Sequence, residues 1–192
     1  VTLLVEDNLG ATHQTTHDIH VLPNGLITLG RLAHYNFSEG QGSSVLDTSG
    51  VGSPLNLTIP DENKVSWLSC GGLSIDESTF IQAQASSSKL FDAIEESNEL
   101  TLETWIKPDN LTQTGPARIV TYSSDAYLRN FTLGQAATEY EVRLRTSGTS
   151  DNGIYPQTTT NDDSVSTQVS HIIYSRDADG NAKIYQNGVL IH

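Results

Sequence analysis

The chain has 192 residues, of which 36% are hydrophobic and 17% charged, and its formal charge is −13. That length is enough for one ordinary domain with a hydrophobic core, or for one domain and a fragment. The acidic excess repels phosphate backbones, so nucleic acid is not an expected partner, and no apolar run approaches the roughly 20 residues that a membrane-spanning helix needs.

The first 25 residues predict a β-hairpin and a linker. Two strand-like segments, residues 1–7 and 16–22, flank a polar stretch whose Asn-Leu-Gly at positions 8–10 suits a turn. Pro23, Asn24 and Gly25 then read as a linker. Two strands alone are marginal in water, so this hairpin is expected to pair with strands from elsewhere.

Residues 32–57 form a long connection that is rich in glycine and carboxylates. Glu39, Asp47 and Ser49 offer oxygen atoms of the kind that calcium prefers, and the glycines let backbone carbonyls turn toward one point. This pattern predicts a structural Ca²⁺ site with Glu39 and Asp47 as ligands. The alternative is an ordinary turn at residues 47–50, with Glu39 a solvated charge.

The rest of the chain predicts one short helix and many strands. Ser87 or Ser88 caps a helix over residues 89–96, with Leu90, Phe91 and Ile94 on one side. Residues 100–107 alternate apolar and polar side chains, and residues 117–123, 130–135 and 140–146 have the same style. Many short strands with regular turns indicate an antiparallel sandwich.

The clearest hairpin lies at residues 171–191. Two β-prone runs flank residues 177–181, where Asp179-Gly180 favours a tight turn, and Gln186-Asn187-Gly188 forms a second turn soon afterwards. Asp177, Asp179 and Asn181 are spaced like the start of a calcium loop, but Val189 stands where such a loop needs its Glu. A hairpin turn is therefore the better interpretation.

Two resemblances to known families are carried by quoted segments of the chain. "VTLLVEDNLGATHQTTHDIHVLPNG" resembles the closing hairpin of a PKD-type or related immunoglobulin-like repeat. Four further segments resemble the laminin-G-like jelly-roll domains of the concanavalin A-like lectin/glucanase superfamily: "YNFSEGQGSSVLDTSGVGSPLNLTI", "ELTLETWIKP", "RNFTLGQAATEYEVRLRT" and "HIIYSRDADGNAKIYQNGVLI".

The resemblances imply an all-β fold, a concanavalin A-like jelly-roll sandwich of two antiparallel sheets preceded by an N-terminal β-hairpin. Residues 1–25 would be the end of a PKD or immunoglobulin-like module plus linker, and residues 26–192 a laminin-G-like domain without its last strands. In related domains the region of Glu39 and Asp47 often supplies ligands to a structural Ca²⁺.

The expected function is a non-catalytic, extracellular adhesion module that binds a glycan or protein surface, within a larger secreted or cell-surface protein of bacterial origin. Trp105, Tyr122, Tyr140, Arg143 and Arg145 are candidates for a ligand-binding face, because aromatic rings stack on sugars and arginines bond hydroxyls. The alternative for the aromatic residues is a place in the core.

Two other functions remain open. Open sheet edges would suit a structural subunit of an extracellular assembly or filament, held together by strand pairing between copies. The superfamily also includes β-glucanases, but the nearest carboxylates are Glu139 with Glu141 and the isolated Glu103. Arg143 and Arg145 would keep the first two ionised, which does not suit a general acid, so we expect no enzyme activity.

Four Asn-x-Ser/Thr triplets begin at Asn36, Asn56, Asn110 and Asn130. They are acceptors for glycans only in a host that glycosylates them.

Overall fold

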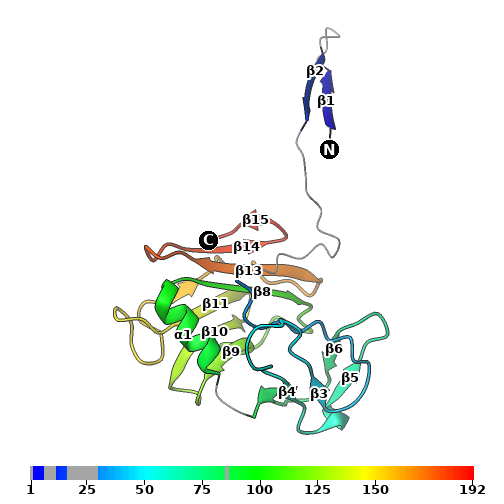
Figure 1. The fold of residues 1–192 in the computed structure, drawn as a ribbon, viewed down its shortest axis with the longest axis vertical. Helices are drawn as coiled ribbons and strands as arrows, with labels where there is room; N and C mark the ends of the chain where they lie inside the picture. The colour runs from blue at the N-terminus through cyan, green and yellow to red at the C-terminus, as the bar shows by residue number, and fades with distance from the viewer. Residues whose placement is uncertain (1, 7–11, 17–29, 85–86) are drawn as a thin grey trace. The chain divides into compact units, whose positions relative to one another are not determined.

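The computed structural model describes residues 2–6, 12–16, 30–84 and 87–192. The chain forms two compact units, Val1–Leu90 and Phe91–His192. Most of the described residues in regular structure belong to antiparallel strands (Figure 1). Among the described helices, none has both the length and the apolar character needed to cross a membrane.

A hairpin lies near the start of the first unit, in a register that differs from the expected one. Strand β1 (Thr2–Glu6) pairs antiparallel with β2 (Thr12–Thr16), and Thr2 lies opposite Thr16. The predicted start of the second strand at residue 16 was therefore wrong, because residues 12–15 are already strand, and the predicted turn at residues 8–10 lies outside the described residues. Three of the five residues in β2 are threonines, whose branched side chains favour extended backbone. Residues 17–22 of the predicted second strand lie outside the described residues.

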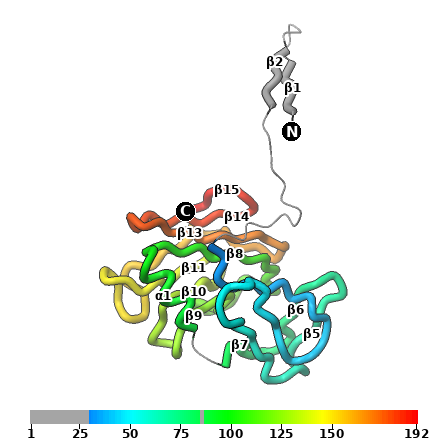
Figure 2. The backbone as a smooth tube through the Cα atoms, viewed as in Figure 1, coloured from blue at the N-terminus to red at the C-terminus, as the bar shows by residue number. Residues whose placement is uncertain are grey.

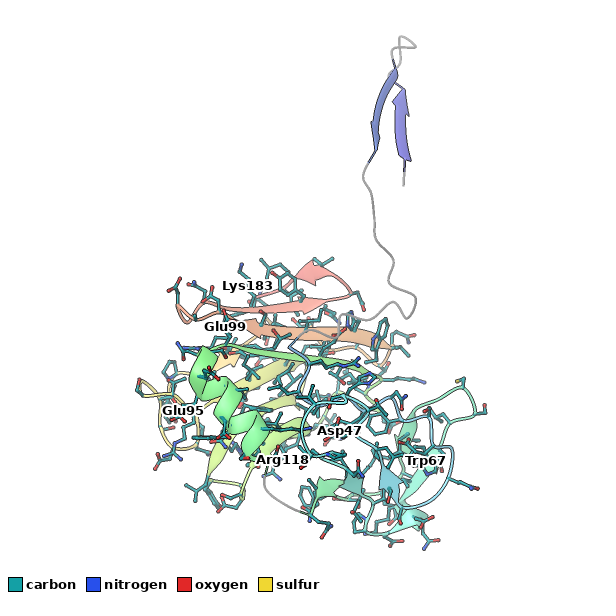
Figure 3. The ribbon with its side chains drawn as sticks, in the orientation of Figure 1. Asp47, Trp67, Glu95, Glu99, Arg118 and Lys183 are labelled. Carbon is teal, nitrogen blue, oxygen red and sulfur yellow. The ribbon has the colours of Figure 1, made fainter. Side chains whose placement is uncertain are left out.

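The remainder of the first unit contains short strands around a small core. Strands β3 (Ser44–Val45), β4 (Leu57–Thr58) and β7 (Gln82–Ala83) form one sheet. The 3-10 helix η1 (Glu62–Lys64) leads into β5 (Val65–Trp67), which pairs with β6 (Leu73–Ile75) (Figure 2). Val45, Ile59 and Val65 form the buried core, and six partly buried side chains, including that of Trp67, pack against it (Figure 3).

The second unit is a sandwich of two four-stranded antiparallel sheets. The first sheet has the strand order β12-β11-β10-β9, and the second has the order β15-β14-β13-β8. The strands of the first are β9 (Ala117–Ser123), β10 (Arg129–Ala136), β11 (Glu139–Leu144) and β12 (Thr158–Thr159). The strands of the second are β8 (Leu100–Ile106), β13 (Ser170–Arg176), β14 (Ala182–Gln186) and β15 (Val189–Leu190).

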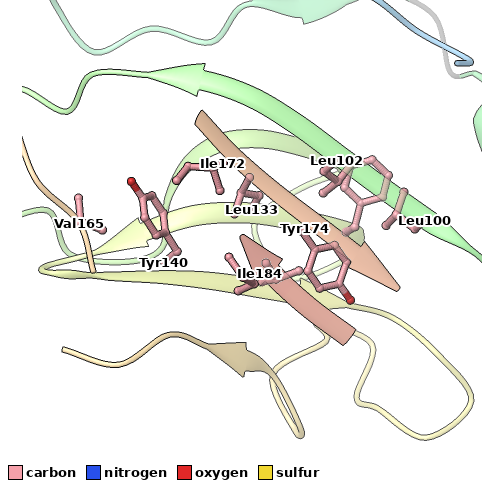
Figure 4. Packing of buried hydrophobic residues seen from close by; sticks show 10 residues of the cluster. Leu100, Leu102, Leu133, Tyr140, Val165, Ile172, Tyr174 and Ile184 are labelled. Carbon is pink, nitrogen blue, oxygen red and sulfur yellow. The ribbon is translucent and has the colours of Figure 1, made fainter. Parts of the chain in front are cut away.

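Both sheets contribute side chains to a single core. Leu133 and Tyr140 from one sheet, and Ile172 and Ile184 from the other, are each fully buried in this cluster (Figure 4). The alternation predicted for β8 is confirmed, because Leu100 and Leu102 are buried in this core while the residues between and after them are more exposed. The second unit is thus the expected all-β jelly-roll sandwich of two antiparallel sheets.

The turns and the helix also follow the sequence closely. Helix α1 (Ser88–Ser97) covers the predicted residues 89–96. Asn187 and Gly188, between β14 and β15, have φ angles of 51° and 81°, as an Asn-Gly hairpin turn requires. Asp177 Oδ1 accepts a hydrogen bond from the Asn181 N–H at 2.8 Å, and this contact closes the turn between β13 and β14.

Candidate functional site

Asp47, one of the two predicted calcium ligands, is the centre of a hydrogen-bond network in the first unit. Its Oδ1 accepts from the backbone N–H groups of His34, at 3.1 Å, and Ser49, at 3.0 Å. Its Oδ2 accepts from the Leu55 N–H at 2.9 Å and from the Lys89 ammonium at 2.6 Å. One carboxylate therefore ties together three points of the glycine-rich connection and the first turn of α1.

The pKa of Asp47 is set by burial and by the hydrogen bonds that its carboxylate accepts. Its side chain is 0% exposed, and burial by itself would raise the pKa of the carboxyl. The hydrogen bonds from Lys89, Leu55 and Ser49 outweigh burial and hold the pKa of Asp47 well below its ordinary value of 3.8. Burial, and then the charge of Asp47, raise the pKa of the nearby Tyr35 phenol to about 12.

The surroundings of Glu39 and Asp47 do not fit a calcium site. Glu39 Oε1 accepts from the Leu46 N–H at 2.8 Å, which leaves Oε2 as its one buried oxygen without a partner. Calcium takes six to eight oxygen ligands, whereas a lysine ammonium already occupies Asp47 Oδ2. Within residues 30–84 and 87–192, no three His, Cys, Asp or Glu side chains are grouped so that they could hold a metal ion. Calcium binding stays a prediction, and the geometry weighs against it.

The second unit contains a cleft of about 1040 Å³, which we call the α1 cleft. One wall is the end of α1 and the residues that follow it, together with Arg176, which bonds to Asn98. The floor comes from strands of both sheets, and the other wall is the loop after β11. Figure 3 labels Glu95 and Glu99 on the α1 wall. The lining residues are Phe91, Ile94, Glu95, Asn98, Glu99, Leu100, Tyr122, Asn130, Phe131, Leu144, Arg145, Thr146, Ser147, Gly148, Thr149, Asp151 and Arg176.

The cleft has an aromatic floor. The Tyr122 and Phe131 rings meet edge to face with centroids 5.9 Å apart, and Phe131 is buried in the core. Burial, and then the charge of Asp92, raise the pKa of Tyr122. The Phe91 side chain on the helix is 45% exposed, so part of the wall is apolar and open to a ligand.

Opposite charges nearly balance around the cleft. Glu95, Glu99 and Asp151 carry negative charge, and Arg145 and Arg176 carry positive charge. Arg145 Nη2 lies 3.1 Å from Asp151 Oδ1, and both side chains are substantially exposed, at 49% and 71%. Arg176 Nη1 instead donates to the backbone oxygen of Asn98 at 2.8 Å, which ties the end of α1 to β13. Arg145 is thus a donor that a ligand can reach, whereas Arg176 positions the wall.

The structure does not bring the predicted ligand-binding residues together on one face. Tyr122 and Arg145 both line the α1 cleft. Arg143 forms an ion pair with Glu141 on β11, and its side chain is only 13% exposed. Tyr140 is fully buried in the core, and Trp105 lies on the outer face of the other sheet with 70% of its surface exposed.

Sequence reasoning missed the α1 wall of the cleft. The helical pattern predicts Phe91 on the apolar side of the helix and gives no signal for Glu95, Asn98 or Glu99 as lining residues. Arg176 was also missed. The available signal was a large aromatic residue beside carboxylates on the only predicted helix, but the position of the facing loop depends on tertiary packing.

We predict that Lys89→Met destabilises the protein at neutral pH by about 3 kcal/mol, because it leaves a buried carboxylate without its cation. The pKa of Asp47 is lowered in the folded state, so its stabilisation is present above the ordinary value of 3.8 and is lost as the pH falls through the folded pKa. The difference in unfolding free energy between wild type and Lys89→Met should therefore become smaller at acidic pH. Urea denaturation at about pH 7 and about pH 3 measures both effects.

The control for this comparison is Lys183→Met, which removes an exposed lysine from β14. We expect its unfolding free energy to stay within about 0.5 kcal/mol of wild type. Equal effects of the two lysine substitutions would contradict the role given to the Asp47–Lys89 pair.

A known family model matches the part of the chain that contains the sandwich and the cleft. Residues 76–192, more than half of the chain, match the laminin G type 3 family model, described as concanavalin A-like lectin/glucanases superfamily. No curated protein and no solved structure matches the chain. The matched residues include every strand of the sandwich and the whole lining of the α1 cleft. On this match, the chain belongs to the concanavalin A-like lectin/glucanases superfamily.

Proposed function

We propose that this protein is a non-catalytic module that binds glycans, with the α1 cleft as its binding site. The observation that carries the proposal is the cleft itself: an aromatic floor, an exposed phenylalanine and a rim of hydrogen-bonding side chains, all within the sandwich of a lectin-related domain. Laminin G-like domains bind glycans or proteins, and they are generally non-catalytic.

The chemistry of the lining favours a neutral sugar. Sugars present C–H faces that pack on rings such as Phe91 and Tyr122, and hydroxyl groups that pair with polar side chains. Three carboxylates and two guanidinium groups around the cleft leave little net charge, so a strongly charged ligand gains little there. The cleft volume lies at the upper end of the usual range for ligand sites, which supports a ligand larger than one sugar ring.

The carboxylates named as glucanase candidates lie in surroundings that support a binding role. Glu141 is paired with Arg143, and the Glu103 carboxylate accepts a hydrogen bond from the His171 ring at 2.8 Å. The expectation that Arg143 and Arg145 keep Glu139 ionised was wrong, because a hydrogen bond with Asp162, and then burial, raise the pKa of Glu139, while the two arginines pair with Glu141 and Asp151. None of the three lines the α1 cleft. A glycosidase needs two carboxylates on either side of one glycosidic bond. In the cleft, Glu95 and Glu99 lie on one wall, and Asp151 opposite is already engaged in an ion pair with Arg145 at 3.1 Å, which supports a binding role.

We further propose an extracellular or cell-surface setting within a larger protein. Laminin G-like domains are typically extracellular, which supports this setting. The β1–β2 pairing supports a strand pair at residues 1–25 that ends a PKD or immunoglobulin-like module, followed by a laminin-G-like domain over residues 26–192.

A structural subunit of an extracellular filament is a second candidate function. Strand β15 is at the edge of its sheet, and its two side chains, Val189 and Leu190, are 65% and 53% exposed. An exposed apolar edge strand is a template for pairing with another chain. This function would show as a mass that rises with protein concentration in light scattering.

For the cleft, we predict that Arg145→Ala lowers glycan affinity at least about tenfold, because a hydrogen bond to a charged donor is worth about 1.5–3 kcal/mol. Folding should be little affected, since its ion pair with Asp151 is exposed. A glycan array that includes neutral plant, fungal and bacterial oligosaccharides gives the ligand, and calorimetry on that ligand gives the affinity.

The charge-matched control is Lys64→Ala in η1, which should bind like wild type. An array without positives would refute the glycan proposal, and unchanged affinity of Arg145→Ala would refute the cleft as its site.

For calcium, we expect that adding a chelator leaves the melting temperature of the protein unchanged. Lys89 already supplies the positive charge at Asp47, and a structural ion bound only to the folded state would raise its stability by mass action. Differential scanning fluorimetry with calcium and with chelator makes the comparison. A melting temperature that rises with calcium and falls back in Glu39→Gln would restore the calcium site.

A further inference from the structure

Trp105 lies on the outer face of the β15-β14-β13-β8 sheet in a defined orientation. Its indole stacks on the ring of His171, with centroids 4.5 Å apart and ring planes 15° from parallel. The two residues are direct partners across the β8–β13 pair. His171 Nε2 in turn lies 2.8 Å from Glu103 Oε1. A tryptophan that is 70% exposed is thus held in position by stacking on His171, whose ring is in turn held by Glu103.

Polar groups surround this aromatic pair. Ile173 on β13 lies opposite both Glu103 on β8 and Tyr185 on β14. Because Tyr174 and Ile184 are buried in the core, their neighbours Ile173 and Tyr185 face the outer side. Tyr185 is therefore two strands from Glu103, about 10 Å at the usual strand spacing. We call the surface formed by Glu103, Trp105, His171 and Tyr185 the Trp105 platform.

The composition of the platform distinguishes between possible partners. A stable protein interface buries about 800 Å² on each side around an apolar centre from which charges are depleted. Here Glu103, with its side chain 61% exposed, lies next to the central ring, and the exposed Lys183 lies one row further along the same face. A pyranose ring fits better, because its C–H face can cover the indole while its hydroxyl groups reach the Glu103 carboxylate and the Tyr185 phenol.

We propose that the Trp105 platform is a second glycan-binding surface, on which a neutral sugar ring stacks on Trp105 and donates a hydroxyl hydrogen bond to Glu103. This inference rests on the proposed function as a glycan-binding module. It adds a site that shares no residue with the α1 cleft, so one chain would contact a polysaccharide at two places and gain avidity from both.

The two tryptophans of the chain, Trp67 and Trp105, allow a direct test. In Trp67→Phe, all tryptophan fluorescence comes from the platform, and in Trp105→Phe it comes from the first unit. Acrylamide quenching is measured with and without hexasaccharides prepared from β-glucan, xylan and mannan. We expect a saturating hexasaccharide to reduce the quenching constant of Trp67→Phe by about half, because a stacked ring covers the indole. The constant of Trp105→Phe should not change.

Two further variants separate this proposal from the cleft. Glu103→Gln should weaken the protection of Trp105, whereas Arg145→Ala, which alters only the cleft, should leave it intact. If Trp105 stays protected in Arg145→Ala and no ligand binds at the cleft, the proposed cleft site is refuted and the platform is supported. Ligand binding at the cleft without any protection of Trp105 would refute the platform and leave the cleft in place.

A measurement without the Trp67 substitution guards against a folding defect, since Trp67 packs against the core of the first unit. The otherwise unchanged chain and its Trp105→Ala variant are run by affinity electrophoresis through gels containing each polysaccharide. We expect the affinity for the polysaccharide, calculated from the retardation, to be about tenfold lower for Trp105→Ala than for wild type, because the variant loses a central tryptophan contact. Equal retardation of the two proteins, or none of either, would overturn the proposal.

Discussion

The apolar layer between the two four-stranded sheets is the constraint on which the rest of the second unit depends. Leu133 from one sheet and Ile172 from the other are both fully buried in it, and burial of such side chains contributes about 1.5–3 kcal/mol each. This layer fixes the register of every strand, because a slip of one residue would turn apolar rows toward solvent. The two surfaces proposed to bind glycans therefore lie on one packed sandwich.

The two proposed glycan surfaces use parts of the sandwich that the core leaves free. The α1 cleft lies where the helix and the loop after β11 meet the ends of strands, and the Trp105 platform lies on an outer sheet face. Both combine rings with a few charged or polar groups. The chain as a whole carries −13, so its field repels sulfated and uronate-rich polymers, which agrees with the proposal that the ligand is a neutral glycan. The nearly balanced charges at the proposed sites and the net negative charge of the whole chain thus both favour an uncharged ligand.

The sequence predicts most of the sandwich because its signals are local. Alternation of apolar residues places Leu100 and Leu102 in the core, and Asn187-Gly188 specifies its own turn. The site is less predictable because it depends on contacts between distant residues. Asp47 looks like a calcium ligand until Lys89, which is 42 residues further along the chain, is seen to pair with it.

The same reason explains the mixed outcome for the predicted ligand-binding face. Tyr122 and Arg145 belong to one cleft, but no periodicity in the sequence reveals that α1 forms its wall. Trp105 alternates correctly to the outer face, yet its stacking on His171 requires the pairing of β8 with β13. Side-chain direction within a strand is readable from the sequence, whereas the neighbours across strands are not.

Hydrogen–deuterium exchange of the intact protein, with and without the best glycan from the array, tests the central claim most directly. We expect slow exchange in β10 and β11 under both conditions, and ligand-dependent protection confined to residues 91–99, residues 145–151 and the platform strands β8, β13 and β14. Protection confined to the first unit, or none at a saturating glycan concentration, would contradict the claim that the sandwich is the glycan-binding body.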